Sequence, residues 1–268
     1  MNDGKRPLVI LIALCGTAAG LPAVARGEPV AAAEVAKEAD ATGIDEDPNL
    51  DHAWFMPTAI TQPRGRWKVS ATELFWLGLS YGVTDDVSLT LGGMVPITDL
   101  TTGWLTTKVR FLSSGRFHLA AQASALYAHH PATVDDFAEP IAERSVVLPS
   151  LGLAATLCLD PECRSLVSGY GGAARSFGDD ADDLFGLFGA SAILHATGIL
   201  KLMAELDHGN QVGWSGDDAA LFAWYGVRLA GRSVAVDVGV LDPLGESGLG
   251  DGDVELDFLP WLKLAYRP

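Results

Sequence analysis

The chain has 268 residues, of which 49% are hydrophobic and 19% charged, with 34 acidic against 18 basic side chains. The net charge of −16 excludes duplex nucleic acid as a partner, because such binding needs surplus Lys and Arg to neutralise phosphates. A disordered chain is excluded too, since the apolar content is high and the charge sparse. The length fits one domain of barrel size or two small domains.

The first 25 residues have the pattern of an export signal. Lys5 and Arg6 precede an apolar run over residues 8–15, and small residues lead to an A-x-A cleavage pattern at 23–25. An uncleaved anchor helix is the alternative, but Pro22 interrupts the run before it reaches about 18 residues. We therefore expect a signal peptide over residues 1–25.

Two further regions follow the signal. Residues 26–52 are rich in Ala, Glu and Asp without apolar periodicity, which predicts a flexible acidic leader. From residue 53 to 268, stretches of about ten residues alternate between apolar and polar side chains and are separated by turn residues. This pattern predicts strands.

Two cysteines remain after the signal. Cys158 and Cys163 flank the turn-forming residues Asp160-Pro161-Glu162, and an exported chain meets oxidising conditions. We predict a disulfide that closes this turn. The competing interpretation, a metal site, lacks a second ligand pair nearby, so we predict neither a metal nor a cofactor.

The alternation divides each strand into two faces. In residues 233–240 four valines share one side and Asp237 lies on the other, because side chains alternate with period 2. Residues 199–207 place leucines opposite charged groups in the same way. The polar faces together give the side chains predicted to line an interior: Lys108, Arg110, Gln122, Lys201, Glu205, Asp207, Arg228, Asp237 and Lys263.

Connection lengths favour a barrel. Short turns near residues 84–86, 113–116, 160–162, 196–198 and 230–232 alternate with longer connections near 97–103, 128–144, 177–183, 208–217 and 242–255, which hold most of the loop acids. An up-and-down meander then has one end of short turns and one end of long acidic loops, as an outer-membrane barrel does. A soluble exported β-sandwich or barrel, with the same valines as its core, is the alternative.

The strand count depends on the N-terminal part. Eleven strands are evident, whereas bacterial barrels have even numbers, and residues 66–84 are too long for one membrane strand. Either residues 53–62 form a strand that turns at 63–65, or 66–84 folds back near Leu74. We predict the first arrangement, because Pro63-Arg64-Gly65 is a turn signal. The apolar stretch 184–204 could instead be a membrane helix, but its glycines favour a hairpin.

One segment resembles a known group of proteins. Residues 79–93, with the sequence Tyr81-Gly-Val-Thr-Asp85, are similar to the Tyr-Gly-[hydrophobic]-Thr-Asp hairpin of uncharacterised bacterial outer-membrane β-barrel proteins, as are Pro57-Thr58-Ala59 and residues 63–65. The resemblance covers about 40 residues. It implies a porin-like or transporter-like barrel and supplies no catalytic residues. Such proteins often end in an aromatic residue, whereas here Tyr266 is followed by two more residues.

The sequence contains only weak candidates for a catalytic motif. His129 and His130 precede acidic residues of a long connection, but the spacing fits no defined site and predicts a solvated acidic loop. The sequence contains no Gly-x-Ser-x-Gly elbow. We therefore predict that the protein is not an enzyme. Five aromatic residues near strand ends are candidates for membrane girdles: Trp67, Tyr81, Trp104, Tyr225 and Tyr266.

These observations lead to one prediction of fold and function. The chain is expected to be an all-β, antiparallel up-and-down transmembrane barrel of about 12 strands in the cell outer membrane. It would act as a passive channel or a structural surface protein, with a polar lumen and acidic loops that favour cations at the entrance. The expected partners are outer-membrane lipid, the barrel assembly machinery, and small solutes or cations. The sequence leaves open the oligomeric state and whether the lumen is an open pore or is plugged by its own paired side chains.

Overall fold

The computed structural model describes residues 47–95, 100–131, 133–134, 140–141, 143–178, 183–211, 220–244 and 259–268. Within these ranges every regular element is a β-strand. In the same ranges no helix is long and apolar enough to cross a membrane.

Twelve strands form the wall of the molecule. They are β1 (Trp67–Thr72), β2 (Trp76–Thr84), β3 (Val87–Met94), β4 (Thr101–Ser114), β5 (Phe117–His130), β8 (Arg144–Cys158), β9 (Leu166–Arg175), β11 (Leu184–Thr197), β12 (Leu200–Gln211), β13 (Ala220–Ala230), β14 (Val234–Leu244) and β15 (Leu259–Tyr266). Three short strands add to these: β6 (Thr133–Val134) pairs with β7 (Pro140–Ile141), and β10 (Phe177–Gly178) extends the pairing of β8.

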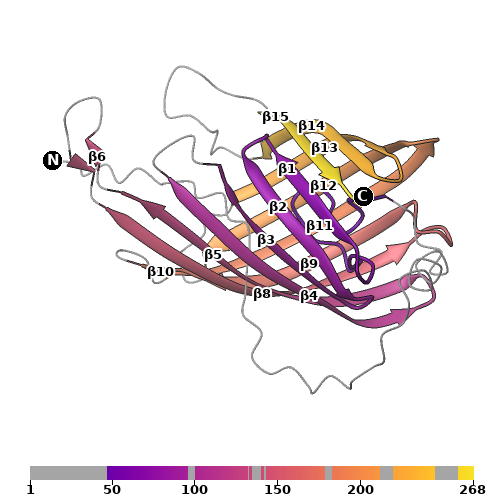
Figure 1. The fold of residues 1–268 in the computed structure, drawn as a ribbon, viewed down its shortest axis with the longest axis horizontal. Coiled ribbons are helices and arrows are strands. Elements are labelled where there is room, and N and C mark those ends of the chain that lie inside the picture. Colours follow the sequence, from indigo (N-terminus) through magenta and orange to yellow (C-terminus); the bar gives the residue numbers. More distant parts are fainter. Residues whose placement is uncertain are drawn as a thin grey trace.

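The wall is a closed antiparallel barrel. Each wall strand pairs with the next one along the chain, β8 pairs with β9, and β1 pairs with β15, which joins the two ends of the sheet. The predicted up-and-down topology with 12 strands is therefore confirmed. Figure 1 shows the strands tilted around one axis, with the C-terminus at the end where the short turns lie.

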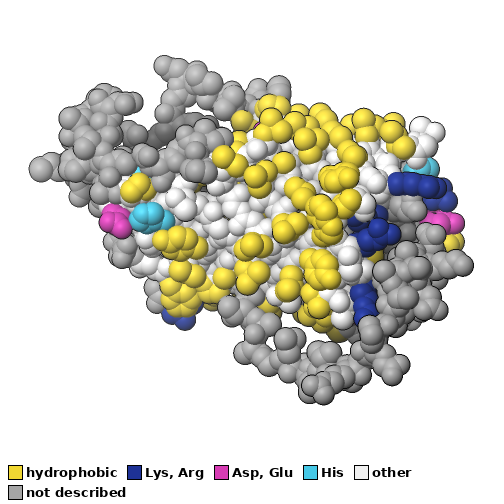
Figure 2. Space-filling view, in the orientation of Figure 1, with side chains coloured by type: hydrophobic (Ala, Val, Ile, Leu, Met, Phe, Trp, Pro, Cys, Tyr) yellow, Lys and Arg dark blue, Asp and Glu magenta, His cyan; other side chains and the backbone are white. Residues whose placement is uncertain are grey.

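Side chains alternate between the outside and the inside of this wall. On β14 the side chains of Val234 and Val238 are exposed on the outer face, whereas Asp237 between them is fully buried inside. β12 repeats the pattern with Leu202 and Leu206 outside. Figure 2 shows hydrophobic side chains spread over the middle of the outer face, with Lys and Arg gathered near the short-turn end. A bilayer suits such an apolar surface.

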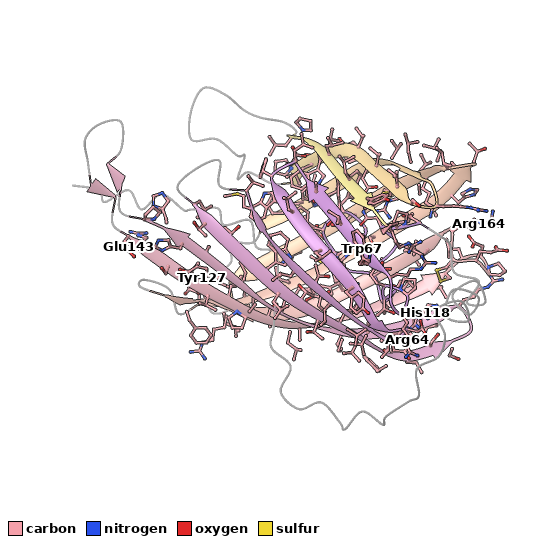
Figure 3. The ribbon with its side chains drawn as sticks, viewed as in Figure 1. Arg64, Trp67, His118, Tyr127, Glu143 and Arg164 are labelled. Carbon is pink, nitrogen blue, oxygen red and sulfur yellow. A yellow bond between two sulfur atoms is a disulfide. The ribbon has the colours of Figure 1, made fainter. Side chains whose placement is uncertain are left out.

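The two ends of the barrel differ. Figure 3 places Arg64, His118 and Arg164 at the short-turn end, and Tyr127 and Glu143 at the opposite end. Strands β4, β5, β8 and β11 have 14 or 15 residues, more than the about 9–11 that cross a bilayer, so they extend beyond it.

The predicted arrangement of residues 53–84 is wrong. Residues 53–62 are not a wall strand, and 66–84 folds back on itself as the hairpin of β1 and β2. Its turn contains Glu73 and Leu74, both with positive φ, and Glu73 is held by backbone hydrogen bonding to Leu262. Neither Gly nor Pro marks this turn, and apolar alternation runs straight through it, so the sequence carried no local signal.

The apolar stretch 184–204 is a hairpin, as predicted. β11 and β12 pair along their whole length, and the turn between them includes Gly198 with a positive φ of 51°.

Candidate functional site

The lumen of the barrel contains a part of the chain itself. Residues 47–62, here called the luminal segment, make hydrogen bonds to wall strands around the circumference, from β1 and β4 to β8, β12, β13, β14 and β15. Most of these residues are buried. The segment is compact, because the Ala53 N–H donates to the Met56 carbonyl and the Thr58 N–H to the Asp51 carbonyl. The lumen is therefore occupied at this level.

A row of charged wall residues holds one side of the luminal segment. Lys201, Arg228, Asp237 and Lys263 lie opposite one another on the four neighbouring strands β12 to β15. The Asp47 carboxylate accepts hydrogen bonds from Lys201 at 2.9 Å and from Arg228 at 3.3 Å.

Arg228 has the most contacts in this row. Its guanidinium donates to both carboxylate oxygens of Asp237, at 2.7 and 2.9 Å, and to the backbone carbonyls of Asn49, His52 and Ala53. The side chain is fully buried. A buried charge is tolerated only when it is paired and hydrogen-bonded, and Arg228 meets both conditions through the luminal segment.

Two further lysines of the wall hold the luminal segment. Lys68 of β1 donates to the side chains of Asp51 and Asn49, and Lys108 of β4 donates to the carbonyls of Asp51 and Ile60. Among the described residues, Lys108 has no carboxylate within 4 Å.

A third anchor is the Glu205 carboxylate of β12. It accepts hydrogen bonds from three consecutive backbone N–H groups, those of Trp54, Phe55 and Met56, at 2.9 to 3.1 Å. Asp207 lies two residues away on the same inner face and is also buried. The turn of the luminal segment thus presents its amides to a fixed anion.

Charge state reinforces this docking. Burial by itself raises the pKa of the Asp47 carboxyl, but the opposite charges of Arg228 and Lys201 outweigh it and lower the pKa. Burial likewise opposes ionisation of Asp51, yet Lys68 holds its pKa well below the usual range. Both carboxylates are therefore ionised at neutral pH, as the pairing with lysine and arginine requires.

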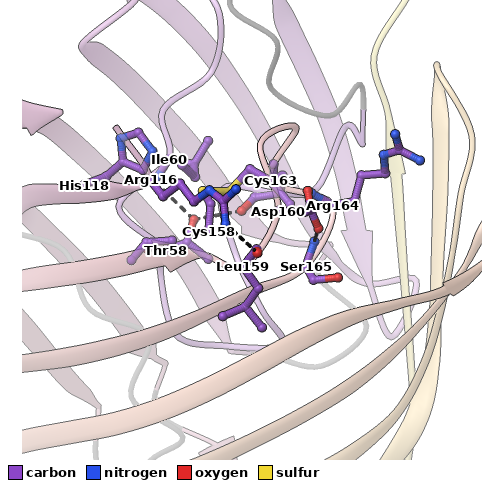
Figure 4. Close-up of a disulfide and its surroundings, with 12 residues drawn as sticks. Thr58, Ile60, Arg116, His118, Cys158, Leu159, Asp160, Cys163, Arg164 and Ser165 are labelled. Atoms are coloured by element: carbon purple, nitrogen blue, oxygen red, sulfur yellow. Dashed lines mark hydrogen bonds between the residues drawn. A yellow bond between two sulfur atoms is a disulfide. The ribbon is translucent and has the colours of Figure 1, made fainter. Parts of the chain in front are cut away.

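The disulfide lies at the short-turn end of the lumen. Cys158 and Cys163 are bonded to each other, both are buried, and they belong to the same hydrophobic cluster as Ile60 of the luminal segment. In Figure 4 the disulfide lies beside Ile60 and Thr58, in a turn where Asp160 accepts the backbone N–H groups of Arg164 and Ser165. The disulfide-bonded turn thus forms part of the apolar surface against which the luminal segment packs.

A cavity of about 140 Å³ remains between the luminal segment and one side of the wall. It is lined by His52, Trp54, Phe55, Lys68, Ser70, Thr72, Trp76, Gly78, Ser80, Thr90, Trp104, Trp261 and Lys263. Four of the seven tryptophans of the chain are in this lining.

The structure places most of the predicted interior residues inside the barrel. The buried ones are Lys108, Gln122, Lys201, Glu205, Asp207, Arg228, Asp237 and Lys263. Arg110 differs, because it lies near the short turns and pairs with Asp86, whose side chain is 60% exposed. Of the predicted girdle residues, Trp67, Tyr81, Tyr225 and Tyr266 are exposed on the outer face. Trp104 instead lines the cavity.

The sequence missed the residues of the luminal segment. Asp47, Asn49 and Asp51 fall in the stretch assigned to the flexible leader, although the structure buries all three. The available signal was an unmatched charge count, since the predicted interior set holds more basic than acidic side chains. The acids of the long connections near 135–139, 179–182, 217–218 and 246–255 lie outside the described residues, as does the predicted signal peptide.

A closed wall without a free edge, apolar outside and charged inside, has the properties that a membrane demands of β-structure. The chain therefore has the architecture of an outer-membrane β-barrel.

Solved structures similar to this barrel share its fold at low sequence identity. A loop-deletion mutant of OmpT, an outer-membrane protein of Vibrio cholerae, has a TM-score of 0.45 at 11% identity, and the match covers 72% of this chain and 62% of that one. The translocator domain of the autotransporter NalP from Neisseria meningitidis has 0.43 at 12%, covering 75% and 86%. LpxR from Salmonella typhimurium has 0.42 at 10%, covering 75% and 99%. No protein-family model matches the chain. No curated protein matches it either.

One prediction is corrected by these comparisons. The absence of catalytic motifs led to the prediction that the protein is not an enzyme, and this conclusion is wrong, because a barrel of this kind can carry an enzyme's site as well as a channel. The barrel fold hosts several kinds of function, and the fold alone excludes none of them.

Proposed function

We propose that the protein is an outer-membrane channel that is closed at rest by its own luminal segment, and that solutes pass when residues 47–62 leave the lumen. The observation that carries this proposal is the way the segment is held. Besides apolar contacts such as those of Leu50 and Ile60, its contacts with the wall include many ion pairs and hydrogen bonds, as for Asp47 with Lys201 and Arg228. Such contacts can exchange for water when the segment is displaced.

Once the luminal segment has left the lumen, the barrel wall would select solutes by their charge. The inward-facing groups that hold the luminal segment are the cations Lys68, Lys108, Lys201, Arg228 and Lys263 and the acids Glu205, Asp207 and Asp237. Removal of the segment takes away Asp47 and Asp51, which pair with three of these cations in the closed state. The emptied lumen then has a surplus of positive charge, which favours anions in the narrow part of the channel. This differs from the cation preference expected from the acidic loops, which lie outside the described residues.

Planar-bilayer recordings test the proposal on the folded protein and a deletion of residues 47–62. We expect the full-length protein to stay closed for most of the recording and the deletion variant to conduct steadily. A reversal potential measured in a salt gradient should show anion preference in the deletion variant. Asp47→Asn with Asp51→Asn should give intermediate behaviour, with frequent openings.

Asp86→Asn is the matched control, because this carboxylate lies in an exposed turn and its one hydrogen bond to a described residue comes from Arg110. It should leave conductance unchanged. A deletion variant that retains the gel mobility of a folded barrel but does not conduct would refute the proposal. A full-length protein that conducts as well as the deletion would refute it as well.

A further inference from the structure

We propose that the cavity between the luminal segment and the β15–β1–β2 side of the wall binds a small monoanion built on a single ring, of the benzoate class. The proposal concerns the closed state and does not rest on the channel function. Three features of the cavity support it: its size, its aromatic walls and its unmatched positive charge.

The size fits one ring. The cavity measures about 140 Å³, and an apolar protein cavity of about 150 Å³ is known to accept benzene. Drug-sized ligands occupy pockets of about 300–1,000 Å³, which is larger than this space. A single six-membered ring with a small substituent therefore fits without movement of the segment.

The walls are aromatic on opposing sides. Trp54 and Phe55 come from the luminal segment, whereas Trp76, Trp104 and Trp261 come from the barrel wall. Trp76 and Trp104 are neighbours with ring centroids 5.8 Å apart, and Phe55 lies 5.3 Å from Trp261. Flat apolar faces on two sides of a narrow cavity suit a planar ring, which can stack on them.

Glycine in the wall permits this arrangement. A Cβ on Gly92 would lie only 2.1 Å from the Trp104 ring, and one on Gly239 would lie 2.7 Å from the Trp54 ring. Both indoles therefore lie directly against bare backbone. Their placement depends on wall positions where only glycine fits, which indicates that the aromatic walls are built to a defined shape.

The positive charge at the cavity is not fully paired. Asp47 pairs with Lys201, Asp237 with Arg228, and Asp51 with Lys68. Lys263 lines the cavity and is largely buried, and its one hydrogen bond to a described residue goes to the Trp54 carbonyl at 3.0 Å. Its ammonium has three donors, so two remain for a ligand. Asp237, the nearest carboxylate by strand pairing, already binds Arg228 and Asn49.

The charged groups around Lys263 favour the binding of an anion beside it. The Lys263 ammonium is attracted by Asp237 and repelled by Lys68, which lines the same cavity. A carboxylate is the group that relieves this repulsion, and a charge-assisted hydrogen bond from a buried ammonium is stronger than one between neutral groups. The hydroxyls of Ser70 and Thr72 offer further hydrogen bonds beside the lysines.

The test uses the full barrel in lipid nanodiscs and three probes: benzoate, benzyl alcohol with the same ring but no charge, and acetate with the charge but no ring. Saturation-transfer NMR on the probe protons measures binding. We expect benzoate to bind at least tenfold more tightly than either other probe. Lys263→Met should reduce benzoate binding to the level of benzyl alcohol, and Lys263→Arg should retain it. Trp104→Ala should weaken both ring probes.

Two controls separate the cavity from general effects. Arg110→Met removes a cation at the short-turn end that is outside the cavity lining, and Trp67→Phe alters a tryptophan of the outer face, so both should leave benzoate affinity within twofold. Each variant is first shown to retain the gel mobility of the folded barrel. Equal binding of acetate and benzoate, an unchanged affinity in Lys263→Met, or no saturable benzoate signal would each overturn the proposal. None of these results concerns conductance, so they neither support nor refute the proposed channel function.

Discussion

At the scale of single residues, the lumen is organised around buried charges that find their partners on a distant part of the chain. Asn49 bonds Asp237 across 188 positions in sequence, and Asp47 bonds Arg228 across 181. Removing one member of such a set leaves the others buried without compensation, which costs more than the set contributes. Substitution of a residue in this network is therefore expected to reduce stability far more than substitution of a charged residue in the turns.

Arg228→Met is expected to destabilise the barrel by about 3–5 kcal/mol, because Asp237 would lose both of its guanidinium bonds and Asp47 one of its two cationic partners. Urea unfolding from lipid vesicles, followed by tryptophan fluorescence, measures the change. Arg110→Met is the matched control, since its pair with the exposed Asp86 contributes less than about 1 kcal/mol. Similar losses in the two variants would contradict the account of the network.

Docking of the luminal segment is expected to weaken as the pH falls. Burial lowers the pKa of the His52 imidazole, which faces Asp51 at 3.1 Å and also Lys108 and Lys263, so the docked state takes up this proton less readily than the released state. Stability of docking is therefore lost from about pH 6.5 downwards. Asp47 and Asp51, whose pKa values are lowered on docking, add a second loss below about pH 4.

Limited proteolysis of the segment across this pH range measures the effect. His52→Gln should abolish the first phase of increasing cleavage and keep the second. An identical pH profile in the two proteins would show that His52 has no part in the docking.

At the scale of the strands, alternation separates a lipid face from a lumen face, and the cost of a charge depends on both face and depth. Leu153 lies on the outer face of β8 and is well exposed, whereas Leu159, also exposed, follows the end of the same strand. The two positions carry the same side chain at different depths.

Leu153→Lys is expected to cost about 2–4 kcal/mol, because the ammonium would be placed in the hydrocarbon region, and Leu159→Lys about 0–1 kcal/mol near the interface. Unfolding free energies from lipid vesicles distinguish the two variants. Equal costs would contradict the assignment of the outer face of β8 to the membrane.

At the scale of the whole molecule, closure of the sheet between β1 and β15 decides how the barrel behaves. A wall without a free edge resists detergent, because strand separation must break a complete ladder of hydrogen bonds. The disulfide joins residues of one turn and does not cross the wall.

The unboiled protein should therefore run on SDS gels with a mobility different from that of the boiled protein, and it should be found in outer-membrane fractions. Reduction of the disulfide before loading should leave this shift in place, since closure does not depend on the bridge. Recovery in a periplasmic extract without any shift would contradict the membrane assignment.

The sequence by itself determined the strands, their two faces and their order. Period-2 alternation with short and long connections is a local property, and each hairpin pairs neighbours in sequence, so the interior position of Lys201 or Asp237 could be read from its own strand. The sequence did not predict the turn at Glu73 and Leu74. This turn forms without glycine or proline and is stabilised by β15, far along the chain.

Only the tertiary structure decided what fills the lumen. Asp47, Asn49 and Asp51 have no apolar periodicity and resemble a solvated leader when taken alone. They become buried because the cations of the closed barrel, Arg228 and Lys68 among them, need partners that the wall does not supply in full. That requirement arises when strands distant in sequence surround one space. It therefore belongs to the closed barrel and to no single segment of the chain.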